Sequence, residues 1–584
     1  MGDDARNADK KEKPVDTLDP CNDKKKEDIV GDALGDFGWW QARVCICLSL
    51  LKLPVAWHQL SIVFLAPPPG DFYCADGIND NNTHFPSNAS LSQIDKCHWH
   101  KMGVEDGAEN STTQAPCQKW IYDHSIFEET IISEWDLVCH RSQSANIAQT
   151  SFMLGILLGN FLFGMISDRF GRKKPLLAAI VLQMVAGIGT AYIPWFEGFL
   201  LLRFLLAFAT GGTMMTSFVI CMEVVGGWWR TAAPILYHLP FSIGHSSLAA
   251  FSYKFRHWRH FQLAISLPSI LLLSYWWLIP ESPRWLLAMG HHKEAKKLLT
   301  AAAATNGRKW NSSTLSNLEE KYSKKREKEN KCIEKGEMHS KEIKSAKEVH
   351  EIINKEQDEK QSGGNVLHLF KTPNLRRKTL VIMYNWLVCG LGFFGIAQYM
   401  GRLAGNIFIN VAISGAIQIP GTIGCMYAMF HLGRRITLTS SQFLAGISCL
   451  LITCAPLGME WLVVAFSAAG LIGMSSAFPT NYLYSAELFP TVVRNAGVGA
   501  ASMCARIGSL IAPFITTLDV FSPIIPPIIY GIFPLLAGIL ALLLPETINQ
   551  HLPDTIEEGE EFGKKHKNGA SITPAEKIEN DGLQ

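Results

Sequence analysis

Long apolar runs separated by short polar segments fill most of the chain. Many runs exceed the roughly 18 residues that a membrane-spanning helix requires. We expect twelve spans, at 42–66, 145–166, 175–193, 198–222, 231–252, 261–279, 379–400, 406–430, 436–456, 461–484, 496–518 and 523–544. The pattern therefore predicts an all-α membrane protein with twelve transmembrane helices.

The polar segments between these runs occur twice, at an offset of roughly 264 residues. This offset is too long for a solenoid repeat and matches the length of a six-helix half. Two such halves around a central site form a rocking transporter. The matching segments are Gly171-Arg172-Lys173 with Gly433-Arg434-Arg435, Glu223 and Arg230 with Glu487 and Arg494, and Pro280-Glu281-Ser282 with Pro545-Glu546-Thr547.

The spans divide the chain into an N-terminal tail (1–41), an N-terminal half (42–285), a Lys/Glu-rich linker (286–378), a C-terminal half (379–547) and a C-terminal tail (548–584). Basic residues favour the cytoplasmic side. Most basic clusters fall on one side, which places both termini and the linker in the cytoplasm. Lys254, Arg256 and Arg259 are a local exception, since they would lie outside.

The composition narrows the function classes. The chain has 584 residues, of which 48% are apolar and 18% charged, and a net charge of +1. We find no basic groove and no metal-ligand spacing, so we expect no nucleic-acid partner, no metal and no cofactor. Paired acid/base groups and nucleophile clusters are also missing, so we do not expect an enzyme. The polar start predicts that no signal peptide is cleaved and that the first span directs insertion.

The segment 67–143 is expected to be a large extracellular loop between the first two spans. It contains three glycosylation sequons, at Asn81, Asn88 and Asn110. It also contains an even set of cysteines, which favours disulfides in an oxidising compartment. The four candidates allow three pairings, and the sequence does not choose among them: Cys74, Cys97, Cys117 and Cys139.

The segment from Gly164 to Lys173 follows the pattern G-x-x-x-D-R-x-G-R-K between spans two and three. It resembles the signature of the major facilitator superfamily, in which this loop latches the inner gate. We expect the duplicated charges to form a gating network when the cytoplasmic side is shut, although they could simply mark the membrane borders. Arg203 lies inside span four and must face protein or water. The gating candidates are Gly164, Asp168, Arg169, Gly171, Arg172, Arg203, Glu223, Arg230, Glu487 and Arg494.

Four further segments carry a narrower resemblance over residues 37–560: Tyr122-Asp123 with 134–139, 280–286, 485–495 and 544–547. With the Cys-rich first loop, they resemble the organic ion transporter family of solute carriers, which carries organic cations, anions and zwitterions. The chain is most similar to insect members labelled organic cation transporter, whose relatives handle carnitine, carcinine and β-alanine. The resemblance implies the major facilitator fold and a transport function.

Ionisable groups at mid-membrane depth suggest the charge of the substrate. Arg506 follows Arg494 by twelve residues, which places it roughly 18 Å into the membrane. The family's cation carriers have an acid at this position, and its anion and carnitine-type members have Arg. Gln418 stands where cation carriers place Glu. Lys52 adds a third positive indication, although its long side chain could instead reach the membrane interface.

These residues predict a neutral to positive cavity that binds a carboxylate, with aromatic rings available for an ammonium group. The alternative for Arg506 is an internal salt bridge or a bond to the backbone. For each aromatic ring it is ordinary packing, and for a histidine it is a hydrogen bond to a neighbouring helix. The substrate-binding candidates are Arg506, Gln418, Lys52, His58, Tyr237, Phe393, Phe394, Gln398 and Tyr399.

We therefore expect a plasma-membrane transporter that works by alternating access on a carboxylate-bearing zwitterion or anion, such as a carnitine-like or β-amino-acid-like solute. The alternatives are an organic cation transporter and, outside transport, a membrane receptor or scaffold. The expected partners are the substrate, the lipid bilayer and a co-transported or exchanged ion. Facilitated diffusion, exchange and sodium coupling all remain open.

Overall fold

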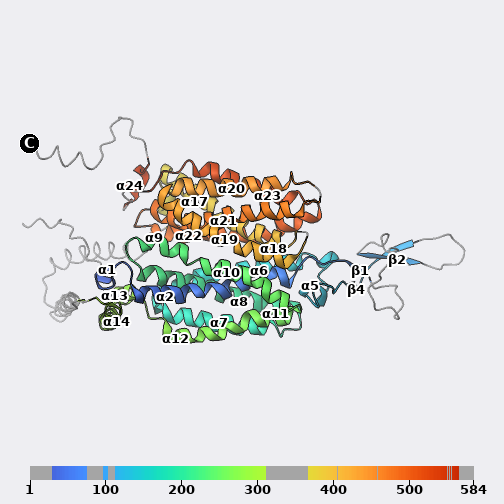
Figure 1. Cartoon of the computed structure of the whole chain (residues 1–584), viewed down its shortest axis with the longest axis horizontal. Helices are drawn as coiled ribbons and strands as arrows, with labels where there is room; N and C mark the ends of the chain where they lie inside the picture. Colours follow the sequence, from blue (N-terminus) through green and yellow to red (C-terminus); the bar gives the residue numbers. More distant parts are fainter. Residues whose placement is uncertain are drawn as a thin grey trace, which may run out of the picture.

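The computed structural model describes residues 29–74, 97–102, 112–308, 310, 366–403, 405–456, 458–548, 550, 553 and 555–563. Figure 1 shows two bundles of helices packed along their length, the N-terminal helices in blue to green and the C-terminal helices in yellow to red. The cavity described below lies between these two halves.

The N-terminal half begins with a first span in three pieces, α2 (Trp39–Leu50), α3 (Lys52–Leu60) and α4 (Ile62–Leu65). The long helices are α6 (Ser144–Phe170), α7 (Lys173–Thr190) and α8 (Phe196–Val224). The remaining pieces are α9 (Trp229–Leu236), α10 (Leu239–Lys254), α11 (Trp258–Ser266), the 3₁₀ helix η2 (Leu267–Ser274) and α12 (Tyr275–Leu278).

The C-terminal half repeats this order. Its helices are α17 (Pro373–Met400), α18 (Ile407–Ala416), α19 (Gln418–His431), α20 (Arg434–Ile452), α21 (Glu460–Leu488), α22 (Arg494–Thr516), the 3₁₀ helix η4 (Thr517–Val520) and α23 (Ile525–Ala541). The helix α17 begins within the segment that we expected to be linker, because Pro373 suits a first helical turn.

Ten helices of the described chain are long and apolar enough to cross a membrane. The other two expected spans correspond to the pair α9 and α10 and to the 17-residue α23. The expected spans five, six and eight are interrupted near Pro240, Pro268 and Pro420. Proline has no N–H to donate and clashes with the carbonyl four residues earlier, which accounts for the breaks.

The two ends of the bundle carry different structures. One end, which we call the linker end, has the short helices α1 (Ile29–Leu34), α13 (Pro283–Ala288), α14 (His292–Thr305), η3 (Val366–Phe370) and α24 (Ile556–Glu561). The opposite end, which we call the disulfide end, has the segment between α4 and α6 with its two disulfides.

The described strands of the disulfide end form two small antiparallel sheets outside the helical bundle. The strand β1 (Phe72–Cys74) pairs with β4 (Trp120–Tyr122), with Phe72 opposite Tyr122. The strand β2 (His98–Met102) pairs with β3 (Thr112–Pro116). The segment also contains α5 (Ile131–Glu134) and the 3₁₀ helix η1 (Cys139–Arg141), which leads into α6.

Two of the three exceptional basic residues near the junction of α10 and α11, Arg256 and Arg259, have local partners. Arg259 forms an ion pair with Glu134 and donates to the Ala191 carbonyl at 2.8 Å. The Arg256 guanidinium donates to the Ile126 carbonyl at 2.6 Å. These contacts give the positive charge at the disulfide end a structural role, so it does not conflict with the topology.

Close helix contact in the C-terminal half places α22 against α17. A Cβ on Gly390 would lie 1.8 Å from the Ala505 carbonyl oxygen, and one on Gly508 would lie 2.1 Å from the Leu387 carbonyl oxygen. Only glycine permits this approach of two backbones. The contact fixes the rotation of α22 and thereby the direction of Arg506, the neighbour of Ala505.

Candidate substrate cavity and gates

A cavity of about 810 Å³ lies between the two halves. This volume suits a small organic molecule. Its wall comes from α3, α6, α8 and α10 of one half and from α17, α19, α21 and α22 of the other. The cavity reaches the linker end, where Asp168, Arg230 and Arg284 line it.

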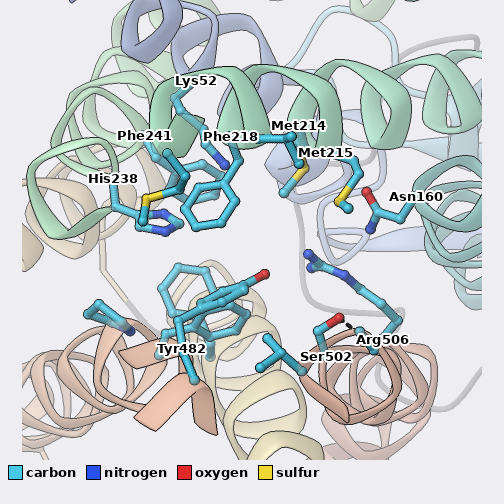
Figure 2. A pocket seen from close by; sticks show the side chains of 18 of the residues that line it. Lys52, Asn160, Met214, Met215, Phe218, His238, Phe241, Tyr482, Ser502 and Arg506 are labelled. Carbon is cyan, nitrogen blue, oxygen red and sulfur yellow. Dashed lines mark hydrogen bonds between the residues drawn. The ribbon is translucent and has the colours of Figure 1, made fainter. Parts of the chain in front are cut away.

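Arg506 projects from α22 into this cavity. Its side chain is directed across the cavity toward the helix that carries Met214 and Met215, and the Tyr482 hydroxyl points toward it (Figure 2). Only 5% of the residue is exposed, and its Nε atom has no hydrogen-bond partner among the described residues. A buried guanidinium without a carboxylate is costly unless a ligand completes it.

Lys52 enters the cavity from the opposite half (Figure 2). It is 3% exposed, and its Nζ lies 4.7 Å from the centroid of the Tyr237 ring. The Tyr237 hydroxyl is in turn 2.5 Å from Ser217 Oγ. Lys52 therefore lies in the cavity wall and does not extend to the membrane interface.

Aromatic rings from both halves form the apolar part of the wall. The Phe241 and Phe393 ring centroids are 5.9 Å apart, and those of Phe218 and Tyr482 are 5.5 Å apart. Each pair joins one half to the other. Such rings can hold an alkyl chain or the face of an ammonium group. The aromatic lining residues are Phe218, Phe241, Phe393, Phe394, Phe478 and Tyr482.

The charges of the cavity wall are mainly positive. The described lining includes six Lys or Arg residues and two carboxylates. Both carboxylates, Asp168 and Glu223, belong to the linker end and bond to Arg172. The deep part of the wall thus presents Lys52 and Arg506 without a lining carboxylate from the described chain.

The first gate network is built on Arg172 at the linker end. Its Nη1 lies 2.6 Å from Asp168 Oδ1, and its Nη2 lies 3.0 Å from Glu223 Oε1. Burial lowers the pKa of Arg172, but the bonds and charges of Glu223 and Asp168 outweigh it and raise the pKa above its ordinary value. The Glu281 carboxylate also accepts from the N–H groups of Arg172 and Lys173.

The C-terminal half repeats the network. Arg434 Nη2 lies 2.9 Å from Glu487 Oε1, and Glu546 accepts from the Arg434 N–H at 2.8 Å. The Thr547 hydroxyl donates to Glu487 at 2.5 Å. We expected these networks to form when the inner side is shut. These contacts lie inside one half each and are present while the cavity reaches the linker end, so the gating role of the duplicated charges stays a prediction.

Arg230 and Arg494 follow Glu223 and Glu487 by seven residues, and we expected them to join the charge networks of these two acids. Arg230 and Arg494 both line the cavity at the linker end. The Arg494 Nε donates to the Phe489 carbonyl at 3.1 Å. Glu223 and Glu487 instead bond the arginines of the preceding loops, Arg172 and Arg434.

Arg203, one of the gating candidates, lies on α8 away from the other gate residues. It lies twenty residues before Glu223 on α8, which is roughly 30 Å along the helix. Its guanidinium is fully buried, donates to Ser61 and Gln149, and lies 4.8 Å from the Phe152 ring centroid. The loop residues Gly164, Arg169 and Gly171 lie at the linker end but are absent from the described cavity lining.

The structure brings five of the nine substrate-binding candidates to the cavity: Lys52, Phe393, Phe394, Gln418 and Arg506. The other four lie outside the described cavity lining, and their part in binding stays a prediction. His58 and Tyr237 are buried among the helices of the N-terminal half, behind the cavity wall. Gln398 and Tyr399 lie in the last turn of α17, toward the disulfide end and beyond the cavity.

Several lining residues escaped the sequence analysis, among them Asn160, Phe218, Phe241 and Tyr482. Of these, Tyr482 had the clearest signal, since a tyrosine within a span carries a hydroxyl that needs a partner. The others are apolar or lie on helices whose rotation the sequence does not specify.

The disulfide end is closed by direct contact between the halves. Thr150 of α6 donates to the Leu510 carbonyl of α22 at 3.3 Å, and Asn146 donates to Thr517 at 3.1 Å. On the other side of the bundle, Ser246 of α10 donates to the Ala412 carbonyl at 3.0 Å. The cavity is therefore open toward the linker end.

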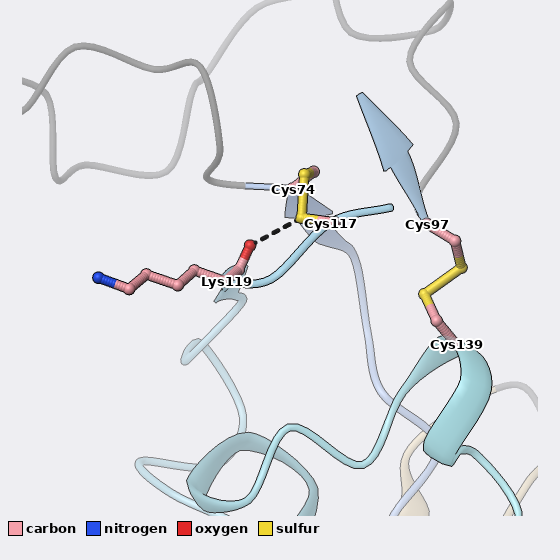
Figure 3. The surroundings of a disulfide bond; sticks show 5 residues. All are labelled: Cys74, Cys97, Cys117, Lys119 and Cys139. Atoms are coloured by element: carbon pink, nitrogen blue, oxygen red, sulfur yellow. Dashed lines mark hydrogen bonds between the residues drawn. A yellow bond between two sulfur atoms is a disulfide. The ribbon is translucent and has the colours of Figure 1, made fainter. Parts of the chain in front are cut away.

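The four predicted disulfide cysteines form two bonds, Cys74–Cys117 and Cys97–Cys139 (Figure 3). The first bond ties β1 to the chain before β4, and the second ties β2 to the start of η1. The three sequon asparagines, Asn81, Asn88 and Asn110, lie outside the described residues.

A family model and a solved structure both match this chain. The family model described as Sugar (and other) transporter matches residues 108–336 and 320–557. The xylose transporter XylE from E. coli, in its inward open conformation, superimposes with a TM-score of 0.55 at 16% identity, over 89% of this chain and 99% of that chain. At this identity the likeness supports the fold alone, which is the predicted major facilitator fold.

Relatives that match nearly the whole chain show which family it belongs to. The organic cation transporter protein of Drosophila melanogaster is 36% identical over 565 residues, which cover 94% of this chain and 96% of the relative. Human solute carrier family 22 member 13 is 33% identical over 574 residues, covering 93% of this chain and 94% of the relative. The chain belongs to solute carrier family 22. It is a multi-pass membrane transporter of the major facilitator fold, and its family is one of transporters rather than enzymes.

Proposed function

We propose that this solute carrier transports a small carboxylate-bearing solute, a zwitterion or an anion, by alternating access. The observation that carries the proposal is Arg506, a buried guanidinium in the cavity with an unbonded Nε. A guanidinium fork fits a carboxylate by two parallel hydrogen bonds. Lys52 adds positive charge from the other half, so both halves attract an anionic group.

The proposal extends to orientation and site. We place the protein in the plasma membrane with the linker end in the cytoplasm, because its basic loop residues, Arg172, Lys173, Arg434 and Arg435, lie at that end. The disulfides of the opposite end are consistent with an extracellular face. Antibody access to epitope tags on the two termini, before and after permeabilisation, tests this orientation.

Uptake of labelled β-alanine, carnitine and tetraethylammonium into cells tests the substrate charge. We expect the wild type to take up the carboxylate-bearing solutes. Arg506→Ala removes the charged hydrogen bonds, each of which contributes about 1.5–3 kcal/mol, so kcat/KM for these solutes should fall about tenfold or more. Arg506→Lys keeps the charge without the fork and should recover part of the loss.

The matched control is Arg377→Ala, which removes an exposed arginine of α17 outside the cavity lining. Surface abundance is measured for every variant. Preference for tetraethylammonium, with uptake unchanged in Arg506→Ala, would overturn the proposal.

The second candidate function is transport of an organic cation. Two observations favour it: the names of the relatives, such as organic cation transporter protein, and the aromatic wall that includes Phe218, Phe241 and Tyr482. A quaternary ammonium needs rings and no hydrogen-bond acceptor. The tetraethylammonium arm of the uptake experiment separates this candidate from the first.

A further inference from the structure

Three buried polar side chains meet where α10 of one half contacts the break between α18 and α19 of the other. His245 is 1% exposed, Ser414 is fully buried and Gln418 is 1% exposed. The His245 Nε2 lies 2.9 Å from Ser414 Oγ, and its Nδ1 lies 2.8 Å from Gln418 Nε2. The imidazole thus bonds the opposite half through both nitrogens.

The surroundings of Gln418 fix the direction of its amide. The amide nitrogen lies 2.9 Å from the main-chain carbonyl oxygen of Ser414, one turn earlier. A carbonyl oxygen can only accept, so the amide atom that faces it must be the NH₂ group. The same nitrogen faces His245, so both of its N–H bonds are engaged.

The direction of the amide then fixes the state of the imidazole. Because Gln418 donates to the His245 Nδ1, that nitrogen carries no proton and the neutral ring has its proton on Nε2. The Nε2–H donates to Ser414 Oγ, whose own proton goes to the Val411 carbonyl at 2.7 Å. Each donor in this hydrogen-bond network therefore has one acceptor.

The amide oxygen is the part of Gln418 that remains for a ligand. It accepts a long 3.4 Å bond from the Ser242 hydroxyl, and both residues line the cavity. A carbonyl oxygen accepts two hydrogen bonds. The wall therefore presents an acceptor at Gln418 and a donor at Arg506.

We propose that His245 is a specificity-determining positioning residue, which together with the Ser414 carbonyl holds the Gln418 NH₂ group, so that the Gln418 oxygen faces the cavity and accepts an N–H from the substrate. This inference rests on the proposed function and narrows its substrate class. The substrate pairs a carboxylate, held by Arg506, with an ammonium that retains at least one N–H. A short amino acid such as β-alanine meets both conditions, and a carboxylate without an amine meets one.

Two conservative variants separate the two bonds of His245. In His245→Asn, the side-chain oxygen can take the place of Nδ1 and still accept from Gln418. In His245→Gln, the side-chain nitrogen can take the place of Nε2 and still donate to Ser414, while the acceptor facing Gln418 is lost. The measurement is kcat/KM for β-alanine relative to propionate, which has the same carbon chain without the ammonium.

We expect the wild type to favour β-alanine over propionate, His245→Asn to keep the ratio within about threefold, and His245→Gln to lower it by about tenfold. A tenfold change equals about 1.4 kcal/mol, which suits one hydrogen bond to a charged group. Propionate uptake should persist in both variants, normalised to surface abundance.

Other outcomes overturn the inference in distinguishable ways. If both variants keep the ratio, His245 does not set the direction of the amide. If both lose uptake of β-alanine and propionate alike, His245 serves only to tie the halves together. If the wild type takes up carnitine but neither β-alanine nor propionate, this inference fails and the proposed function stands. If it takes up none of the three carboxylates, both fail.

Discussion

At the scale of single residues, the cost of burying a charge explains why Arg506 is informative. An arginine in a membrane span is expensive unless protein or ligand groups complete its hydrogen bonds. The Arg172 and Arg434 side chains are also largely buried, at 11% and 12% exposed, but carboxylates bond them within their own halves. Arg506 instead faces an open cavity, and its Nε has no partner among the described residues, which is why the proposed function pairs it with a ligand carboxylate.

The gate loops depend on glycine at one position in each half. Gly171 and Gly433 have φ angles of +95° and +91°, in the left-handed region that favours glycine. A Cβ at Gly433 would also lie 2.6 Å from Glu546 Oε2, the carboxylate that accepts from the next N–H groups. The turn and its capping carboxylate therefore exclude any side chain.

We predict that Gly433→Ala destabilises the protein, because alanine is strained at this φ and displaces Glu546. The expected cost is about 1–2 kcal/mol or more, which should lower the melting temperature in detergent by about 3 °C or more. The control is Gly424→Ala in α19, where nothing lies within 4 Å of the added Cβ. An equal melting temperature for both variants would contradict the prediction.

At the scale of elements, the breaks in the helices place the polar groups of the cavity. The interruption before α10 puts His238 and Phe241 on the cavity wall, and the interruption between α18 and α19 puts Gln418 there. Proline creates both breaks. A continuous helix would place these side chains at other rotations about its axis.

The number and order of the helices could be predicted from the sequence because apolar length and loop charges carry that information directly. Arg506 and Gln418 could be predicted as cavity residues because their polarity conflicts with their depth. His58 and Tyr399 could not be excluded in the same way. Their placement depends on how each helix is rotated against its neighbours, and hydropathy does not encode that rotation in spans that are buried on most sides.

The short helix α24 docks on the first turn of α17 through charge and hydrogen bonds. The Glu560 carboxylate accepts from the main-chain N–H groups of Asn374 and Leu375, and Lys378 donates to the Gly559 carbonyl at 3.0 Å. A carboxylate at a helix N-terminus satisfies unpaired donors and the helix dipole. The contact attaches the segment after α23 to the C-terminal half.

We predict that Glu560→Gln loosens α24, because a neutral amide has one oxygen acceptor in place of a carboxylate. A loss of about 1 kcal/mol should make amide hydrogen exchange in α24 about fivefold faster. Glu561→Gln, on the exposed side of the same helix, is the matched control. If the two variants exchange at the same rate, the docking contact does not hold the helix.

At the scale of the whole molecule, the two ends differ in how the halves meet. The cavity reaches the linker end, whereas the disulfide end is closed by cross-half contacts. At the disulfide end, Phe408 of α18 packs among aromatic residues of the N-terminal half. The Phe408 ring centroid is 5.8 Å from that of Phe64, 5.7 Å from that of Phe127 and 5.6 Å from that of Tyr253. Alternating access requires these contacts to separate in the opposite state.

We predict that Phe408→Ala shifts the population toward a state that is open at the disulfide end. The lost ring contacts stabilise the closed end alone, and a shift of about 1.4 kcal/mol changes the ratio of the two states about tenfold.

Thr150→Cys, placed where Thr150 bonds Leu510 across the halves, reports the opening. Cys454, a free and exposed cysteine just after α20, is replaced by serine to remove background labelling. An impermeant thiol reagent applied at the disulfide end should then label Thr150→Cys about tenfold faster when Phe408→Ala is present. Phe514→Ala, at an exposed residue of α22, is the control and should leave the rate unchanged. Equal rates in both variants would mean that Phe408 packs at this end without restraining its opening.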